Sequence, residues 1–141
     1  MQMQFEVQGM DFNRAGEAAA KIKKALQMVG MEVHTVRRAV IVAYEAELNI
    51  VIHARRGTLT AHVYPDRVEI EALDEGPGIP DITLAMQEGY STAPPHIREM
   101  GFGAGMGLPN INRCSDKLQI DSAVNKGTHV KSIIFNQASG E

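Results

Sequence analysis

One short stretch organises the whole sequence: residues 74–81, DEGPGIPD. It follows residues 68–73, VEIEAL, in which apolar and polar side chains alternate as in a strand with one buried face. Glycine adopts backbone conformations that other residues avoid, and proline fixes φ, so the stretch predicts a stiff turn whose backbone can be approached closely. A plain surface turn with a capping Asp is the alternative interpretation, because Asp-x-Gly is common in turns.

The composition is that of a globular protein that works in a reducing compartment. The chain has 141 residues, of which 44% are hydrophobic and 22% charged, and we interpret residues 1–141 as a single domain. The net charge of −3, without a clustered basic stripe, argues against a nucleic-acid binder. The single cysteine, Cys114, cannot form an internal disulfide. Without a signal-like segment or a membrane-spanning apolar run, we expect a cytoplasmic protein that does not bind membranes.

The first part of the chain predicts a strand and two helices. Residues 3–7 alternate as a strand, and a helix with an N-cap at Asp11 then continues at three- and four-residue apolar steps to Gly30. The second helix, residues 35–55, is apolar nearly all round, which is typical of a helix packed on several sides.

The rest of the chain reads as strands with short helices between them. Grouped helices beside adjacent strands predict an α+β fold, a two-layer sandwich whose mixed, largely antiparallel sheet has its helices on one face. The glycine- and proline-rich residues 89–107 form a long loop, which in a compact domain is usually functional or disordered. The expected elements are a hairpin of residues 59–64 and 67–73, helices over 82–88 and 106–114, and strands over 117–121 and 128–135.

Two polar residues, Glu45 and Asn49, interrupt the apolar far side of the second helix. They are four residues apart, so their side chains lie on the same face and converge. Glu47 is a nearby competitor that points to the opposite, core-like face, for which the sequence offers no explanation. His53, one turn further on, is interpreted as a packing residue at the helix end.

Four motifs in order carry a family resemblance. They are Glu45-x-x-x-Asn49, Asp74-x-Gly-x-Gly78, the run GFGAGMGL over residues 101–108, and Gly127-Thr128. Their order and spacing resemble the ATP-binding domain shared by gyrase, heat-shock protein 90, histidine kinases and DNA mismatch-repair MutL proteins. The chain is most similar to the small serine/threonine kinases of bacterial anti-sigma factors, from about residue 38 to 135.

The resemblance implies roles at the adenine end of a nucleotide site. Asp74 would accept a hydrogen bond from the exocyclic amine of adenine, which distinguishes adenine from guanine. Gly78 would let the backbone pass close to the base, and Thr128 would form a hydrogen bond near it.

Further roles concern the phosphates. A helix that begins at a glycine run offers free N–H groups and a positive dipole end to phosphate oxygens. Residues 93–105 are expected to form a lid, at whose base Ser91 and Thr92 would either meet the nucleotide or act as a plain loop cap. The residues that the resemblance places beside the nucleotide here are Ser91, Thr92, Gly103, Gly105, Met106, Gly107 and Leu108.

The resemblance also assigns the chemistry. Mg²⁺ prefers oxygen ligands between phosphates and one or two protein groups, and the protein ligand would be Asn49. Glu45 would be the general base that accepts the proton of the attacking hydroxyl.

The implied function is that of an ATP- and Mg²⁺-dependent serine/threonine kinase that phosphorylates and binds an antagonist protein. Residues 76–82, 88–92 and 105–109 look most like the stressosome switch kinases, whose substrates include scaffold-like domains. A sigma factor as a second partner and a homodimer stay open. The alternatives are a non-catalytic binding module that responds to nucleotide, and a stand-alone ATPase or histidine-kinase catalytic domain.

Overall fold

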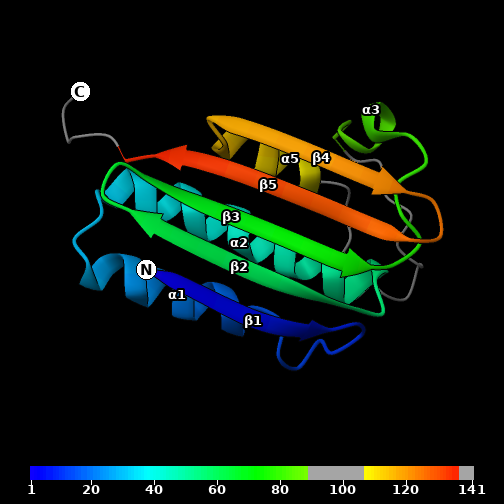
Figure 1. Cartoon of the computed structure of the whole chain (residues 1–141), viewed down its shortest axis with the longest axis horizontal. Helices are drawn as coiled ribbons and strands as arrows, with labels where there is room; N and C mark the ends of the chain where they lie inside the picture. Colours follow the sequence, from blue (N-terminus) through cyan, green and yellow to red (C-terminus); the bar gives the residue numbers. More distant parts are fainter. Residues whose placement is uncertain (89–106, 137–141) are drawn as a thin grey trace.

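The computed structural model of the chain describes residues 1–88 and 107–136, and Figure 1 shows them as a sheet with helices on one face. The sheet has five strands in the order β1-β2-β3-β5-β4. This arrangement confirms the α+β two-layer fold. The strands are β1 (Gln2–Gln8), β2 (Arg56–Tyr64), β3 (Arg67–Glu75), β4 (Lys117–Ala123) and β5 (Gly127–Phe135).

The described sheet is antiparallel throughout, which corrects the expectation of a mixed sheet. In sequence, two helices connect β1 to β2, namely α1 (Glu17–Met28) and α2 (Val33–His53). They form an antiparallel pair, so β2 comes back to pair with β1 in the opposite direction. Strands β3 and β4 run in the same direction, but β5 lies between them (Figure 1).

Helix α1 begins later than the sequence predicted. Residues 12–16 form turns, and Gly16, immediately before the helix, has a φ of 98°. This left-handed residue separates the turns from the helix, so Asp11 is not its N-cap. The predicted end is close to correct, because Gly30 follows α1 with a φ of 78°.

Helix α2 ends at His53 rather than at residue 55, since Ala54 is extended and the N–H of Arg55 donates to the carbonyl of Glu75. Strand β3 correspondingly continues through Asp74 and Glu75, which the sequence placed in the turn. Two further helices are α3 (Ile82–Ala85), shorter than predicted, and α5 (Gly107–Cys114). No helix in the described ranges is long and apolar enough to cross a membrane.

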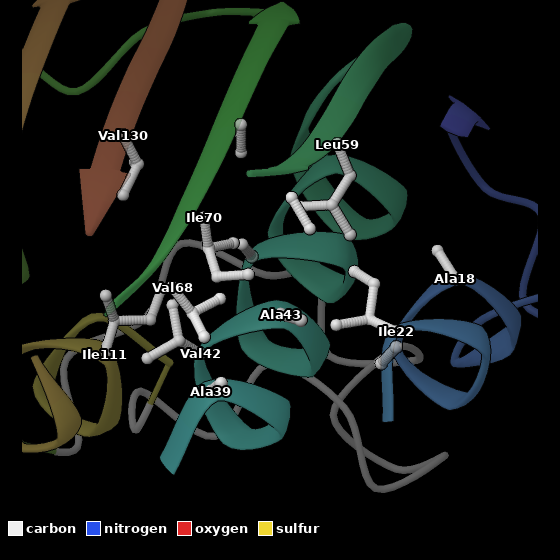
Figure 2. Close-up of a cluster of buried hydrophobic side chains, with 14 of the residues drawn as sticks. Ala18, Ile22, Ala39, Val42, Ala43, Leu59, Val68, Ile70, Ile111 and Val130 are labelled. Carbon is white, nitrogen blue, oxygen red and sulfur yellow. The ribbon is translucent and has the colours of Figure 1, made fainter. Parts of the chain in front are cut away.

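The core lies between the sheet and the helices, with α2 at its centre. Figure 2 shows Ala39, Val42 and Ala43 of α2 among side chains of the other elements. Ile22 of α1 and Ile111 of α5 are fully buried on either side of α2, which confirms a helix packed on several sides. Because α2 is fixed from several directions, the residues on its remaining free face are held in defined positions.

Candidate functional site

The candidate site lies at the end of the sheet where β3 ends, β5 begins and α2 reaches its C-terminus (Figure 1). Asp74 follows the buried residues Val68, Ile70 and Ala72 at two-residue steps, so its side chain lies on the helix-facing side of β3. The backbone N–H of Thr128 donates to Asp74 Oδ1 at 3.1 Å. The structure therefore brings together the two residues that were predicted to meet adenine.

The Asp74 carboxylate is half-buried. Burial raises its pKa above the usual value, and the hydrogen bond from the N–H of Thr128 opposes that rise. Among the described residues, no donor meets the other carboxylate oxygen, Oδ2. Asp74 can therefore accept a hydrogen bond from a ligand.

The loop after Asp74 is fastened to the turn between β4 and β5. Gly78 has a φ of 76°, and a Cβ at this position would lie 2.4 Å from the carbonyl oxygen of Ala123. The N–H of Asn125 donates to the carbonyl of Pro77 at 2.8 Å, and the N–H of Ile79 donates to Ser122 Oγ at 2.7 Å. The sequence predicted a stiff loop from its glycines and prolines, and the structure adds hydrogen bonds that attach this loop to the β4–β5 hairpin.

Glu45 and Asn49 reach the start of α5. A Cβ built on Gly107, the first residue of α5, would lie 3.2 Å from Asn49 Oδ1 and 3.3 Å from Glu45 Oε2. Burial raises the pKa of Glu45, and a hydrogen bond from the Asn110 side chain opposes the rise. A carboxylate, an amide oxygen and a helix N-terminus therefore meet in one place.

Glu47 has a different role from Glu45. It is 3% exposed, and its two carboxylate oxygens accept the N–H groups of Ala18 at 3.2 Å and Ala19 at 3.0 Å. These N–H groups belong to the first turn of α1, which has no partner for them within its own helix. Glu47 is therefore the cap of α1, supplied by the neighbouring helix.

The remaining predicted residues divide into two groups. The side chain of Leu108 is buried in the core, so at this position only the backbone at the start of α5 can face a ligand. The others lie outside the described residues, as does the predicted lid over residues 93–105: Ser91, Thr92, Gly103, Gly105 and Met106.

A pocket of about 240 Å³ adjoins the loop after Asp74. Half-buried His53 lies on its wall, and burial lowers the pKa of the imidazole, which favours the neutral ring. Sequence analysis interpreted His53 as a packing residue and did not connect it with this loop. The pocket is lined by His53, Arg55, Glu75, Gly76, Pro77, Asn125 and Lys126.

The described side chains fit a metal that is held mainly by phosphate. In residues 1–88 and 107–136, no three acidic, histidine or cysteine side chains form a metal-binding group. Mg²⁺ bound to nucleotide phosphates needs only one or two protein oxygens. The amide oxygen of Asn49, directed at the start of α5, suits that role.

Comparison with known proteins identifies the family. Residues 11–134 match the model of the histidine kinase-like ATPase domain. The chain belongs to this family. Within it, the chain is 35% identical over 105 residues to the serine/threonine-protein kinase RsbT of Bacillus subtilis, covering 70% of this chain and 73% of RsbT. It is 32% identical over 115 residues to the anti-sigma F factor of Caldanaerobacter subterraneus, covering 82% of this chain and 68% of that protein.

Solved structures of low sequence identity share the fold of this histidine kinase-like ATPase domain. A Mycobacterium tuberculosis structure with RsbU and RsbW domains matches 98% of this chain with a TM-score of 0.64 and 13% identity. The match spans one third (33%) of that structure's chain. The mycobacterial sensor histidine kinase MprB matches with a TM-score of 0.55 and 13% identity. The family resemblance and the fold expected from the sequence are confirmed, and ATP is the nucleotide of the family.

Proposed function

We propose that the chain is an ATP- and Mg²⁺-dependent serine/threonine protein kinase of the anti-sigma regulatory type. The observation that carries this proposal is the meeting of Glu45 and Asn49 at Gly107, where a helix begins. This arrangement offers a base, a metal ligand and free N–H groups to one phosphoryl group. The similarity to RsbT, a serine/threonine-protein kinase, supports the type of reaction.

The nucleotide would extend from Asp74 to the start of α5. Asp74 would accept the adenine amine, and the first N–H groups of α5 would donate to phosphate oxygens, because the helix leaves them without internal partners. Asn49 would hold Mg²⁺ through its amide oxygen. The bound ion would neutralise negative charge on the phosphates during transfer.

Glu45 would act as the general base. As a serine oxygen of the substrate forms a bond to the γ-phosphorus and the bond to the ADP oxygen breaks, Glu45 takes the serine proton. Because burial raises its pKa, Glu45 holds a transferred proton more firmly than an exposed glutamate would.

The substrate would be a protein, in keeping with the anti-sigma kinase relatives. We propose an antagonist protein or a stressosome-scaffold-like domain that presents a serine, and a stable complex with that partner as part of the regulation. A sigma factor would be a second partner. The relatives named as anti-sigma F factors support a regulatory partner of this kind.

The test is transfer of the labelled γ-phosphate of ATP to a candidate antagonist encoded beside this chain. The wild type is compared with Glu45→Ala and with Glu6→Ala, which removes an exposed carboxylate on β1. We expect acid-stable phosphoserine with the wild type and Glu6→Ala, and almost none with Glu45→Ala.

Other outcomes separate the alternatives. Equal transfer by Glu45→Ala would show that Glu45 is not the base. An acid-labile product would indicate a histidine-kinase domain, and ADP release without transfer would indicate an ATPase. Tight partner binding that ATP modulates, without any transfer, would indicate a binding module.

A further inference from the structure

Ser122 joins three parts of the candidate site through one hydroxyl group. It lies on β4 opposite Thr128 of β5, on the same helix-facing side of the sheet as Asp74. Ser122 Oγ accepts the N–H of Ile79 at 2.7 Å and contacts the carbonyl of Gly127 at 3.2 Å. It also lies 3.0 Å from Thr128 Oγ1. No sequence motif pointed to this residue.

Counting hydrogens fixes the direction of each bond. A serine hydroxyl has one proton to donate and two lone pairs that accept. The N–H of Ile79 takes one lone pair, and the carbonyl of Gly127 can only accept, so the proton of Ser122 goes to Gly127. The second lone pair is then left for Thr128, whose hydroxyl must donate to Ser122. This is the one assignment that satisfies all three contacts.

The assignment determines what Thr128 offers to a ligand. Its only hydroxyl proton is used on Ser122, so Thr128 Oγ1 presents lone pairs alone. Its backbone N–H is used on Asp74 Oδ1. The end of the sheet therefore presents two acceptors side by side, the Asp74 carboxylate and the Thr128 hydroxyl oxygen, and neither residue keeps a donor for the ligand.

We propose that Ser122 is a positioning residue that determines base specificity, because it holds the Thr128 hydroxyl as an acceptor. This inference rests on the proposed nucleotide site. The amine at position 6 of adenine carries two protons, one for the Asp74 carboxylate and one for the Thr128 hydroxyl oxygen. An oxygen at position 6 would face the same two acceptors and leave desolvated lone pairs unpaired, so this arrangement favours ATP over a purine nucleotide with a 6-oxygen. Ser122 never touches the base and acts through Thr128 and the loop at Ile79.

The experiment measures the affinities of ATP–Mg²⁺ and ITP–Mg²⁺ by calorimetry, since inosine carries an oxygen in place of the 6-amine of adenosine. In Ser122→Ala the Thr128 hydroxyl can rotate and donate. We expect the preference for ATP over ITP to fall about tenfold, the equivalent of one hydrogen bond. The conservative Ser122→Thr, which keeps the hydroxyl, should keep the preference.

Two further variants separate positioning from loss of structure. Thr128→Val removes the hydroxyl that Ser122 orients, so adding Ser122→Ala to Thr128→Val should leave the ATP/ITP ratio unchanged. Ser132→Ala removes another buried hydroxyl of β5, one that is paired with Ser115, and should leave the wild-type ratio. A loosened loop alone would weaken both nucleotides equally.

An unchanged ratio in Ser122→Ala, with ATP still bound by the wild type, would overturn this inference and leave the proposed function intact. A further fall in the ratio when Ser122→Ala is added to Thr128→Val would also overturn it. If the wild type bound neither nucleotide, the proposed function would fail, and this inference with it.

Discussion

Glu45 and Glu47 stand two residues apart on α2 and meet different surroundings. Glu47 is buried and satisfied by two N–H groups of α1, so its charge is compensated within the fold. Glu45 is half-buried, and within residues 1–88 and 107–136 the Asn110 amide is the one group that offsets its cost of desolvation. A carboxylate held in this way is poorly stabilised by the fold, which suits a group that has to take up a proton.

Replacing Glu45 by Gln should separate activity from stability. The change removes the buried charge but keeps the size of the side chain, so we expect a higher melting temperature, because the desolvation cost disappears. Phosphate transfer should fall at least about a hundredfold, as for loss of a general base. Calorimetric melting and the labelled-ATP assay measure both; a lower melting temperature would show that the carboxylate is stabilised in the fold.

The raised pKa of Glu45 also predicts a pH dependence. The folded protein binds the proton more tightly than the unfolded chain, so Glu45 costs no stability below the usual pKa of 4.5 and its full cost above the raised value. The stability gained by Glu45→Gln should therefore be absent at the acid end and grow as the pH rises. Urea unfolding at several pH values tests this, and a gain that shrinks with rising pH would contradict it.

Replacing Glu47 by Ala should destabilise the fold. Two buried N–H groups of α1 would lose their acceptors, at a cost of about 2–3 kcal/mol in the free energy of unfolding, as for lost hydrogen bonds to a charged group. Glu17→Ala, which removes an exposed acid from the first turn of the same helix, is the control and should cost less than about 1 kcal/mol. Equal losses in urea unfolding would indicate a helix-dipole effect instead of a cap.

At the scale of elements, the hairpin of β4 and β5 supports the loop after β3. Ser122 accepts a hydrogen bond from Ile79, and Asn125 donates one to Pro77. Ser122 lies 43 residues after Ile79, so the adenine end of the proposed site depends on a hairpin that comes much later in the sequence. A change that pushes this loop away from the hairpin should therefore weaken nucleotide binding before it unfolds the protein.

Gly78→Ala and Gly30→Ala form a matched pair for this purpose. Both glycines have a nearly equal positive φ, 76° and 78°, but a Cβ on Gly78 would meet Ala123 while one on Gly30 meets nothing within 4 Å. Gly30→Ala should cost about 1 kcal/mol of stability for the left-handed conformation, and Gly78→Ala should cost more, because its Cβ also displaces the Ala123 backbone. Only Gly78→Ala should also weaken ATP binding, as measured by calorimetry; equal ATP affinities in the two variants would contradict the role of the hairpin.

The elements themselves were predictable where local pattern decides them. The β2–β3 hairpin turns at Pro65-Asp66, as the sequence indicated, and α2 has the packing its all-round apolarity predicted. The predicted start of α1 was wrong because the residue that caps this helix, Glu47, belongs to another helix. Glu47 lies 29 residues after Ala18 and 28 residues after Ala19, whose N–H groups it accepts. The end of β3 was wrong because pairing with β2 carries the strand through Asp74 into a segment that reads locally as a turn.

At the scale of the whole molecule, the candidate site is formed because the order of the elements brings residues far apart in sequence to one end of the sheet. Asp74, Thr128 and the Glu45–Asn49 pair come from three elements that end or pass at one end of the sheet. The sequence pointed to these residues through a family resemblance that four motifs carry together in their order, and Asp74, Thr128, Glu45 and Asn49 each lie in one of those motifs. Ser122 lies in none of these motifs. Its proposed role depends on the contacts of its hydroxyl with Ile79, Gly127 and Thr128, which only the folded sheet brings together.

The most direct test of a single ATP site running from Asp74 to Glu45 is calorimetry of ATP–Mg²⁺ with the wild type, Asp74→Asn and Glu45→Gln. An amide at position 74 can turn a donor toward the adenine amine, so we expect Asp74→Asn to lose most of the ATP affinity. Glu45→Gln, at the phosphate end, should still bind ATP while failing to transfer phosphate. Unchanged ATP binding by Asp74→Asn would contradict the account.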